Sequence, residues 1–157
     1  MKKSYKTEYE VLQRGKQAIG RPFYEIDTTN RLKTGKGGIG NFVEESWFGL
    51  QVNNKSAPDF KEAGVELKVI PYLYTSKGIR AKERLVCNII DYMGEYKKTF
   101  EKSSFYLKCN TMLIMAYLHR DDVGKEEYKI DAAEIFKFPE SDLPIIMKDW
   151  EIIINKI

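Results

Sequence analysis

Residues 58–74 of the chain read PDFKEAGVELKVIPYLY, and this stretch decides the fold. Its second part, residues 65–74, follows Gly64 and is rich in β-branched and aromatic residues, so it predicts a β-strand. Side chains alternate between the two faces of a strand. Glu66 and Lys68 therefore project from one face, and the apolar residues between and beside them project from the other. The strand carries a carboxylate and an ammonium side by side.

The sequence on either side of this strand predicts further strands and helices. Residues 84–92, RLVCNIIDY, predict a second strand that forms a hairpin with the first, and TMLIMAYL and EYKIDAAEIFKF predict two more at 111–118 and 127–138. Helical spacing of apolar residues predicts helices at 5–19, 40–48 and 141–157, the last with Ser141 as N-cap, and residues 92–108 read as a loop followed by a short helix. This order predicts an α/β (α+β) domain with a central mixed sheet flanked by helices.

Length and composition fit a single domain that covers residues 1–157. The hydrophobic fraction of 43% suffices for a packed core, and the sequence shows no repeat or Pro/Ser-rich linker. We expect a cytoplasmic protein without a membrane partner, because no apolar run is long enough for a span or a signal peptide. Cys87 and Cys109 are then expected to be buried free thiols. The single histidine, His119, follows an apolar strand, which argues against histidine-zinc and serine-protease chemistry.

The net charge of +3 is unevenly distributed along the chain. Residues 1–120 carry 21 Lys/Arg against 13 Asp/Glu, a balance of +8, and residues 121–157 carry 5 against 10, a balance of −5. A basic body favours a polyanion such as nucleic acid as partner, although a solvated charged surface explains the same pattern.

The residues that carry chemistry lie around the first strand. Asp59 precedes the Gly64 turn, so the chain can fold back and bring its carboxylate toward Glu66. Two carboxylates and the Leu67 carbonyl offer the oxygen ligands that Mg²⁺ prefers and leave places for water and a phosphate oxygen. Lys68 is then placed to orient a nucleophile or to stabilise negative charge. The alternative is a solvated Glu–Lys pair on an amphipathic strand.

The spacing P-D-…-E-x-K resembles the signature of the restriction-endonuclease-like nucleases, and PDFKEAGVELKVIPY is similar to the corresponding motif of the MutH family. The resemblance extends along most of the chain, through KGGIGNFVEESWFG, KSSFYLKCNTMLIM and KDWEIIINKI. Residues 82–92, KERLVCNIIDY, and the tail look more similar to the Sau-type restriction enzymes that cut GATC. The resemblance implies a Mg²⁺-dependent DNA endonuclease, with Mn²⁺ as a substitute.

By matching position, the resemblance implies that Asp59 and Glu66 bind the metal, with Leu67, and that Lys68 is the catalytic lysine. The family has a further glutamate in the helix after its Ile-Gly pair. Counting forward from Ile39-Gly40 selects Glu44, and counting back from Trp47 selects Glu45, because the chain has one extra residue here. We favour Glu44, on the expectation that the extra residue is absorbed at the end of the helix. The alternative for Glu44 is an exposed helix carboxylate.

The resemblance also implies residues that contact DNA. Lys36 and Gly37 match the family's loop that approaches DNA, although the loop reads equally as a flexible connector. Lys108 matches a lysine near the scissile phosphate, with a solvated strand-end lysine as the alternative. Arg80, Lys82 and Arg84 form a basic cluster at the hairpin turn that could contact phosphates. The alternative is an ordinary charged turn.

Together these features predict the catalytic domain of a type II restriction endonuclease that acts on double-stranded DNA at GATC sites. The alternatives are a MutH-type nicking enzyme of mismatch repair and a catalytically silent MutH-like module that binds DNA. We expect the domain to be part of a longer protein and to pair with a second MutH-like domain or with a dimer partner.

Overall fold

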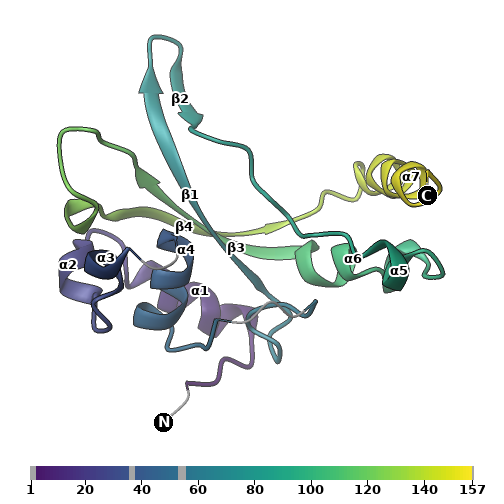
Figure 1. The fold of residues 1–157 in the computed structure, drawn as a ribbon, viewed down its shortest axis with the longest axis horizontal. Coiled ribbons are helices and arrows are strands. Elements are labelled where there is room, and N and C mark those ends of the chain that lie inside the picture. The colour runs from purple at the N-terminus through teal and green to yellow at the C-terminus, as the bar shows by residue number, and fades with distance from the viewer. Residues whose placement is uncertain (1–2, 36–37, 53–55, 157) are drawn as a thin grey trace.

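A mixed four-stranded sheet forms the centre of the molecule (Figure 1). The computed structural model describes residues 3–35, 38–52 and 56–156. The strands are β1 (Glu66–Thr75), β2 (Gly78–Ala81), β3 (Thr111–Leu118) and β4 (Ile130–Lys137), in the order β2-β1-β3-β4. β1 and β3 run parallel and the other two pairs are antiparallel. This confirms the predicted mixed sheet flanked by helices.

Helices and turns precede, connect and follow the strands. Before β1 lie α1 (Glu8–Lys16), α2 (Phe23–Ile26), α3 (Arg31–Thr34), α4 (Ile39–Phe42) and the π-helix η1 (Val43–Trp47). The crossover that links the parallel strands β1 and β3 contains, after β2, α5 (Tyr92–Glu95), η2 (Phe100–Lys102) and α6 (Ser104–Cys109). η3 (Lys125–Glu127) follows β3, and α7 (Leu143–Ile154) follows β4.

Three predicted boundaries differ from the structure. The first helix begins at Glu8, because Thr7 caps it and forms a capping box with Glu10. The hairpin is present, but its second strand is the short β2 and residues 84–92 run on without strand structure. The last helix begins after Asp142, which makes no side-chain cap hydrogen bond, so the prediction of Ser141 as N-cap is wrong.

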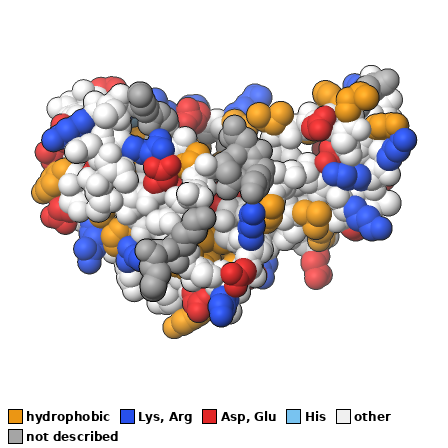
Figure 2. Space-filling model, turned by 60° about the horizontal axis from the view of Figure 1, so that its bottom comes forward, with side chains coloured by type: hydrophobic (Ala, Val, Ile, Leu, Met, Phe, Trp, Pro, Cys, Tyr) orange, Lys and Arg blue, Asp and Glu red, His pale blue; other side chains and the backbone are white. Residues whose placement is uncertain are grey.

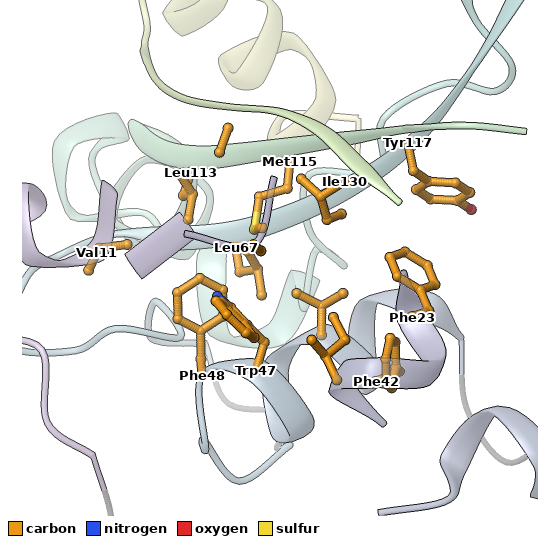
Figure 3. Packing of buried hydrophobic residues seen from close by; sticks show 14 of the residues in the cluster. Val11, Phe23, Phe42, Trp47, Phe48, Leu67, Leu113, Met115, Tyr117 and Ile130 are labelled. Carbon is orange, nitrogen blue, oxygen red and sulfur yellow. The ribbon is translucent and has the colours of Figure 1, made fainter. Parts of the chain in front are cut away.

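The main core lies between the sheet and the N-terminal helices (Figure 3). Its aromatic side chains come from both layers, and Phe48 and Phe60 meet edge to face with ring centroids 4.9 Å apart. α1 approaches the sheet closely at Gly15, where an added Cβ would lie 3.0 Å from Leu113 Cδ2. A larger residue at this position would require the Leu113 side chain to shift by a few tenths of an ångström. We call this part of the molecule, with the sheet, the sheet body.

A second, smaller core forms where α7 meets the crossover. Phe100, Trp150 and Ile154 are buried there. Elements α5, η2, α6 and α7, which we call the C-terminal lobe, extend to one side of the sheet in Figure 1 and carry exposed apolar side chains, visible in orange in Figure 2. No helix in the described part of the chain combines the length and apolar character of a membrane span.

Candidate active site

A tight turn brings Asp59 back against the start of β1. Phe60 and Val65 pair across it, with Phe60 N–H donating to the Val65 carbonyl at 2.9 Å and Gly64 N–H donating to the Phe60 carbonyl at 2.8 Å. Gly64 closes the turn at φ +67°, a left-handed conformation that glycine adopts without strain. As a result, Asp59 Oδ2 accepts the Leu67 N–H at 3.0 Å, and Asp59 N–H donates to Glu66 Oε2 at 3.3 Å.

Two lysines converge on the other oxygen of Glu66. Lys68 Nζ lies 3.1 Å from Glu66 Oε1, and Lys108 Nζ, from α6, lies 3.6 Å from the same atom. Both lysine side chains are largely buried, with relative exposures of 15% and 18%. The sheet body and the C-terminal lobe thus each contribute one cation to one carboxylate.

The two candidate accessory glutamates have different surroundings. Glu45 is paired with the Arg31 guanidinium. Glu44 is 7% exposed and its Oε1 is buried without a hydrogen-bond partner among the described residues. Both lie in η1, where the chain winds as a π-helix, the form that accommodates one extra residue within a helix. This π-turn is the last turn of the helical segment that begins at Ile39, the end at which we expected an extra residue to be absorbed.

Three carboxyl groups influence one another at the site. Burial, reinforced by the charges of Asp59 and Glu66, raises the pKa of Glu44 to about 8. Burial and the charge of Asp59 raise the pKa of Glu66 to about 7, although Lys68 and Lys108 oppose the shift. Without a cation, the folded protein therefore favours protonation of Glu44 and Glu66 near neutral pH.

These side chains line one polar cavity of about 240 Å³. Its lining comprises Gly40, Asn41, Glu44, Val52, Asp59, Glu66, Leu67, Lys68 and Lys108. Within residues 3–35, 38–52 and 56–156, no three His, Cys, Asp or Glu side chains form a ready-made metal cluster. The donors fit a more open site, because Mg²⁺ is commonly bound through one or two carboxylates while it keeps several waters. The unpartnered Glu44 oxygen and the raised carboxyl pKa values indicate that a bound cation would stabilise the charged form of these carboxyl groups.

The basic residues of the hairpin lie elsewhere. Arg80 pairs with Leu73 on β1, seven residues beyond Glu66, which at about 3.3 Å per residue is roughly 23 Å along the strand. β2 is fully exposed, and Lys82 and Arg84 follow it on the surface. The cluster does not line the cavity. The predicted contacts Lys36 and Gly37 lie outside the described residues.

One partner of Lys68 escaped the sequence analysis. The backbone carbonyl of Cys87 accepts a hydrogen bond from Lys68 Nζ at 2.8 Å. Every residue has a backbone carbonyl, so the residue type does not reveal which carbonyl accepts from Lys68. Residues 84–92 were also predicted to form a strand, in which the carbonyls would pair with a neighbouring strand. Cys87 and Cys109 are free thiols, and Cys109 is buried as expected whereas Cys87 is partly exposed.

Comparison with known proteins agrees with this geometry. The family described as DNA mismatch repair enzyme MutH matches residues 48–149. The type II restriction enzyme Sau3AI of Staphylococcus aureus is 37% identical over 96% of this chain, which spans 31% of that enzyme. The DNA mismatch repair proteins MutH of Vibrio vulnificus and Shewanella woodyi are each 28% identical, over 100% and 98% of this chain and 70% and 68% of their own lengths. The chain is therefore a member of the MutH family.

Proposed function

We propose that this chain is the catalytic domain of a Mg²⁺-dependent DNA endonuclease of the type II restriction class, which hydrolyses phosphodiester bonds at GATC sites. The observation that carries the proposal is the convergence of Asp59, Glu66, Lys68 and Lys108 on one polar cavity beside Glu44. The similarity to Sau3AI supports the restriction class, and the GATC site follows from the resemblance of the motifs.

The carboxylates are the expected metal ligands. Asp59 and Glu66, with the Leu67 carbonyl, would hold Mg²⁺ or Mn²⁺, which supplies charge neutralisation for phosphodiester hydrolysis when bound. Glu44 faces the same pair and would lose its proton when a cation enters, because its raised pKa results from burial and neighbouring negative charge. We propose Glu44, and not the Arg31-paired Glu45, as the accessory carboxylate.

The two lysines supply positive charge from fixed positions. Lys68 is held by Glu66 on one side and by the Cys87 carbonyl on the other, so its ammonium is oriented before substrate arrives. Preorganised donors of this kind stabilise the negative charge that develops on phosphoryl oxygens. Lys108 adds a second cation at the same carboxylate. The presence of every group that the chemistry needs favours an active domain over a silent DNA-binding module.

Double-stranded DNA is the expected partner. Lys36, Gly37, Lys108 and the exposed hairpin residues Arg80 and Lys82 are the proposed contacts, the hairpin reaching phosphates away from the cleaved bond. Phosphate contacts position a duplex without reading its sequence. A second MutH-like domain or a second copy of the chain would allow both strands to be cut.

The proposed function is tested by two measurements on the same variants, calorimetric metal titration and cleavage of duplex DNA. Calorimetric titration with Mg²⁺ and Mn²⁺ should give a binding signal that Asp59→Ala and Glu66→Ala abolish and that Glu25→Ala, an exposed carboxylate control, retains. Cleavage of duplexes with GATC, and with that sequence scrambled, is measured beside it. Metal binding that survives Asp59→Ala would refute the site, and equal cleavage of both duplexes would refute the specificity.

A further inference from the structure

The segment between β2 and α5, which contacts Lys68 through the Cys87 carbonyl, has few anchors. After Lys82, whose N–H donates to the Pro71 carbonyl, residues 83–90 make no backbone–backbone hydrogen bond within the described part of the chain. Asn88 Nδ2 donates to Ser104 Oγ at 3.3 Å. Two further anchors are the Cys87 carbonyl and Ile90, which packs against the core of the C-terminal lobe. Cys87 can therefore shift without breaking a backbone–backbone hydrogen bond of its own segment.

The Cys87 carbonyl joins the lysine to a thiol of α6. It accepts hydrogen bonds from Lys68 Nζ at 2.8 Å and from Cys109 Sγ at 3.3 Å. Cys109 directly follows Lys108 and is fully buried, so its position is fixed by the helix. The place of the Lys68 ammonium thus depends on a carbonyl that Cys109 holds.

The side chains of Cys87 and Cys109 are neighbours, since Cys109 Sγ lies 3.3 Å from the carbonyl oxygen of Cys87. A hydrogen bond with Cys109, together with the nearby Lys68 ammonium, lowers the pKa of the Cys87 thiol to about 6, although burial opposes the shift. The same hydrogen bond and burial raise the pKa of Cys109. Cys87 is the partly exposed member of the pair. It is therefore the thiol that reacts with a solvent oxidant, because thiolate character and access govern cysteine reactivity.

We propose that Cys87 and Cys109 form a redox latch, which positions Lys68 in the dithiol state and displaces it when the two sulfurs join as a disulfide. The effect on catalysis rests on the proposed nuclease function, whereas disulfide formation does not. Cys87 and Cys109 are positioning residues here, since they act through Lys68.

The oxidant is a low-molecular-weight disulfide such as oxidised glutathione. The Cys87 thiolate attacks one of its sulfurs, forming a mixed disulfide and releasing one glutathione thiolate. Cys109 then attacks the Cys87 sulfur, releases the second glutathione thiolate and passes its proton to it. Two electrons leave the protein and reduce one glutathione disulfide to two thiols. Reversal requires only an excess of reduced thiol.

Geometry gives the direction of the effect. A disulfide requires an S–S distance of about 2.05 Å, well inside hydrogen-bond distance. Because Cys109 is held in α6, the loosely anchored Cys87 moves, and Cys109 loses the proton that it donates to the carbonyl. The acceptor of Lys68 moves with Cys87. A misplacement of about 1 Å at a reacting centre can cost roughly a hundredfold in rate.

The test compares the chain after equilibration with reduced and with oxidised glutathione. Mass spectrometry and thiol titration should show one intramolecular disulfide between Cys87 and Cys109, with a defined midpoint in a glutathione series. The ratio of reduced to oxidised cleavage rate should exceed tenfold, through kcat more than KM, and dithiothreitol should restore the rate. In Cys87→Ser and Cys87→Ser/Cys109→Ser this ratio should stay near one. Circular dichroism confirms that each form is folded.

Peptide mapping after labelling with an amine reagent reports on Lys68 without reference to cleavage. Oxidation should change the labelling rate of Lys68 at least several-fold and leave that of the exposed Lys148 unchanged. Absence of the disulfide, or a disulfide that alters neither Lys68 labelling nor rate, overturns the latch. A reduced chain that binds no metal and cuts no DNA, but shows the disulfide and altered labelling, refutes the nuclease and retains the latch.

Discussion

The sheet body and the C-terminal lobe are packed in different ways. The body buries a large aromatic core between the sheet and the N-terminal helices, and it holds Glu66 and Lys68 on β1 with Asp59 in the turn that precedes this strand. The lobe has a three-residue core, a cavity of about 220 Å³ beside Trp150, and a buried Trp150 Nε1 with no hydrogen-bond partner in the described chain. The proposed metal ligands thus belong to the part with the larger core, while Lys108 and Cys109 belong to the part with the smaller core.

The largest expected difference between the two parts is catalytic. Lys68→Ala should lower the cleavage rate by about 10²–10³-fold, as loss of one preorganised donor commonly does. Lys108→Ala should cost about tenfold, the value of one hydrogen bond to a charged group. Steady-state cleavage of a GATC duplex measures both, with Lys148→Ala in exposed α7 as the charge-matched control. A greater loss at Lys108 than at Lys68 would reverse the assigned roles.

Shortening a buried side chain to alanine should also destabilise the two cores in different ways. Leu113→Ala in the body should lower the global free energy of unfolding by about 2–5 kcal/mol, because Leu113 is fully buried against α1. Trp150→Ala should instead open the lobe locally. Hydrogen exchange measures the contrast: α7 amides should lose protection in Trp150→Ala while β3 amides keep it. Simultaneous loss in both elements would show that the molecule unfolds as one unit.

The pH dependence of stability sharpens the contrast between the two parts, because Lys108 of the C-terminal lobe contacts Glu66, one of the carboxyl groups of the sheet body with a raised pKa. Glu44 and Glu66 have pKa values raised from 4.5 to about 8 and about 7, so the folded state binds more protons than the unfolded state in this range. Metal-free stability should therefore fall as pH rises from about 4.5 to 8. Mg²⁺ competes with these protons, so its increase of the melting temperature should be greater at pH 8 than at pH 6. Glu44→Gln should flatten the metal-free profile, and an unchanged profile would remove Glu44 from the coupled group.

The smallest expected effect belongs to the hairpin, which lies far from both cores. Arg80→Ala and Lys82→Ala should each weaken duplex binding a few-fold on all sequences and lower the salt slope by about one. Fluorescence anisotropy across a salt series measures this. A sequence-dependent loss would show that the hairpin reads bases.

Much of this arrangement could be predicted from the sequence, for reasons visible in particular elements. β1 and β3 are strongly β-forming segments, and the Gly64 turn predicted that Asp59 folds back to Glu66. The prediction of a strand at residues 84–92 was wrong, because their β-branched residues suit a strand but no strand among the described residues pairs with them. The Cys87 carbonyl on Lys68 depends on tertiary packing of backbone, which residue types do not encode.

The parallel pairing of β1 with β3 has a consequence for the order of folding. Glu66 pairs with Met112, so the whole of β2, α5 and α6 must be enclosed in a loop before that contact forms. Non-local pairings of this kind form slowly, because closing the loop costs entropy before the contacts form and stabilise it. The turn at Gly64 joins Asp59 to Glu66 locally and can form early. We therefore expect the Asp59–Glu66 turn to form before Lys108 and the Cys87 carbonyl reach it, so that the cavity is completed only when β1 and β3 pair.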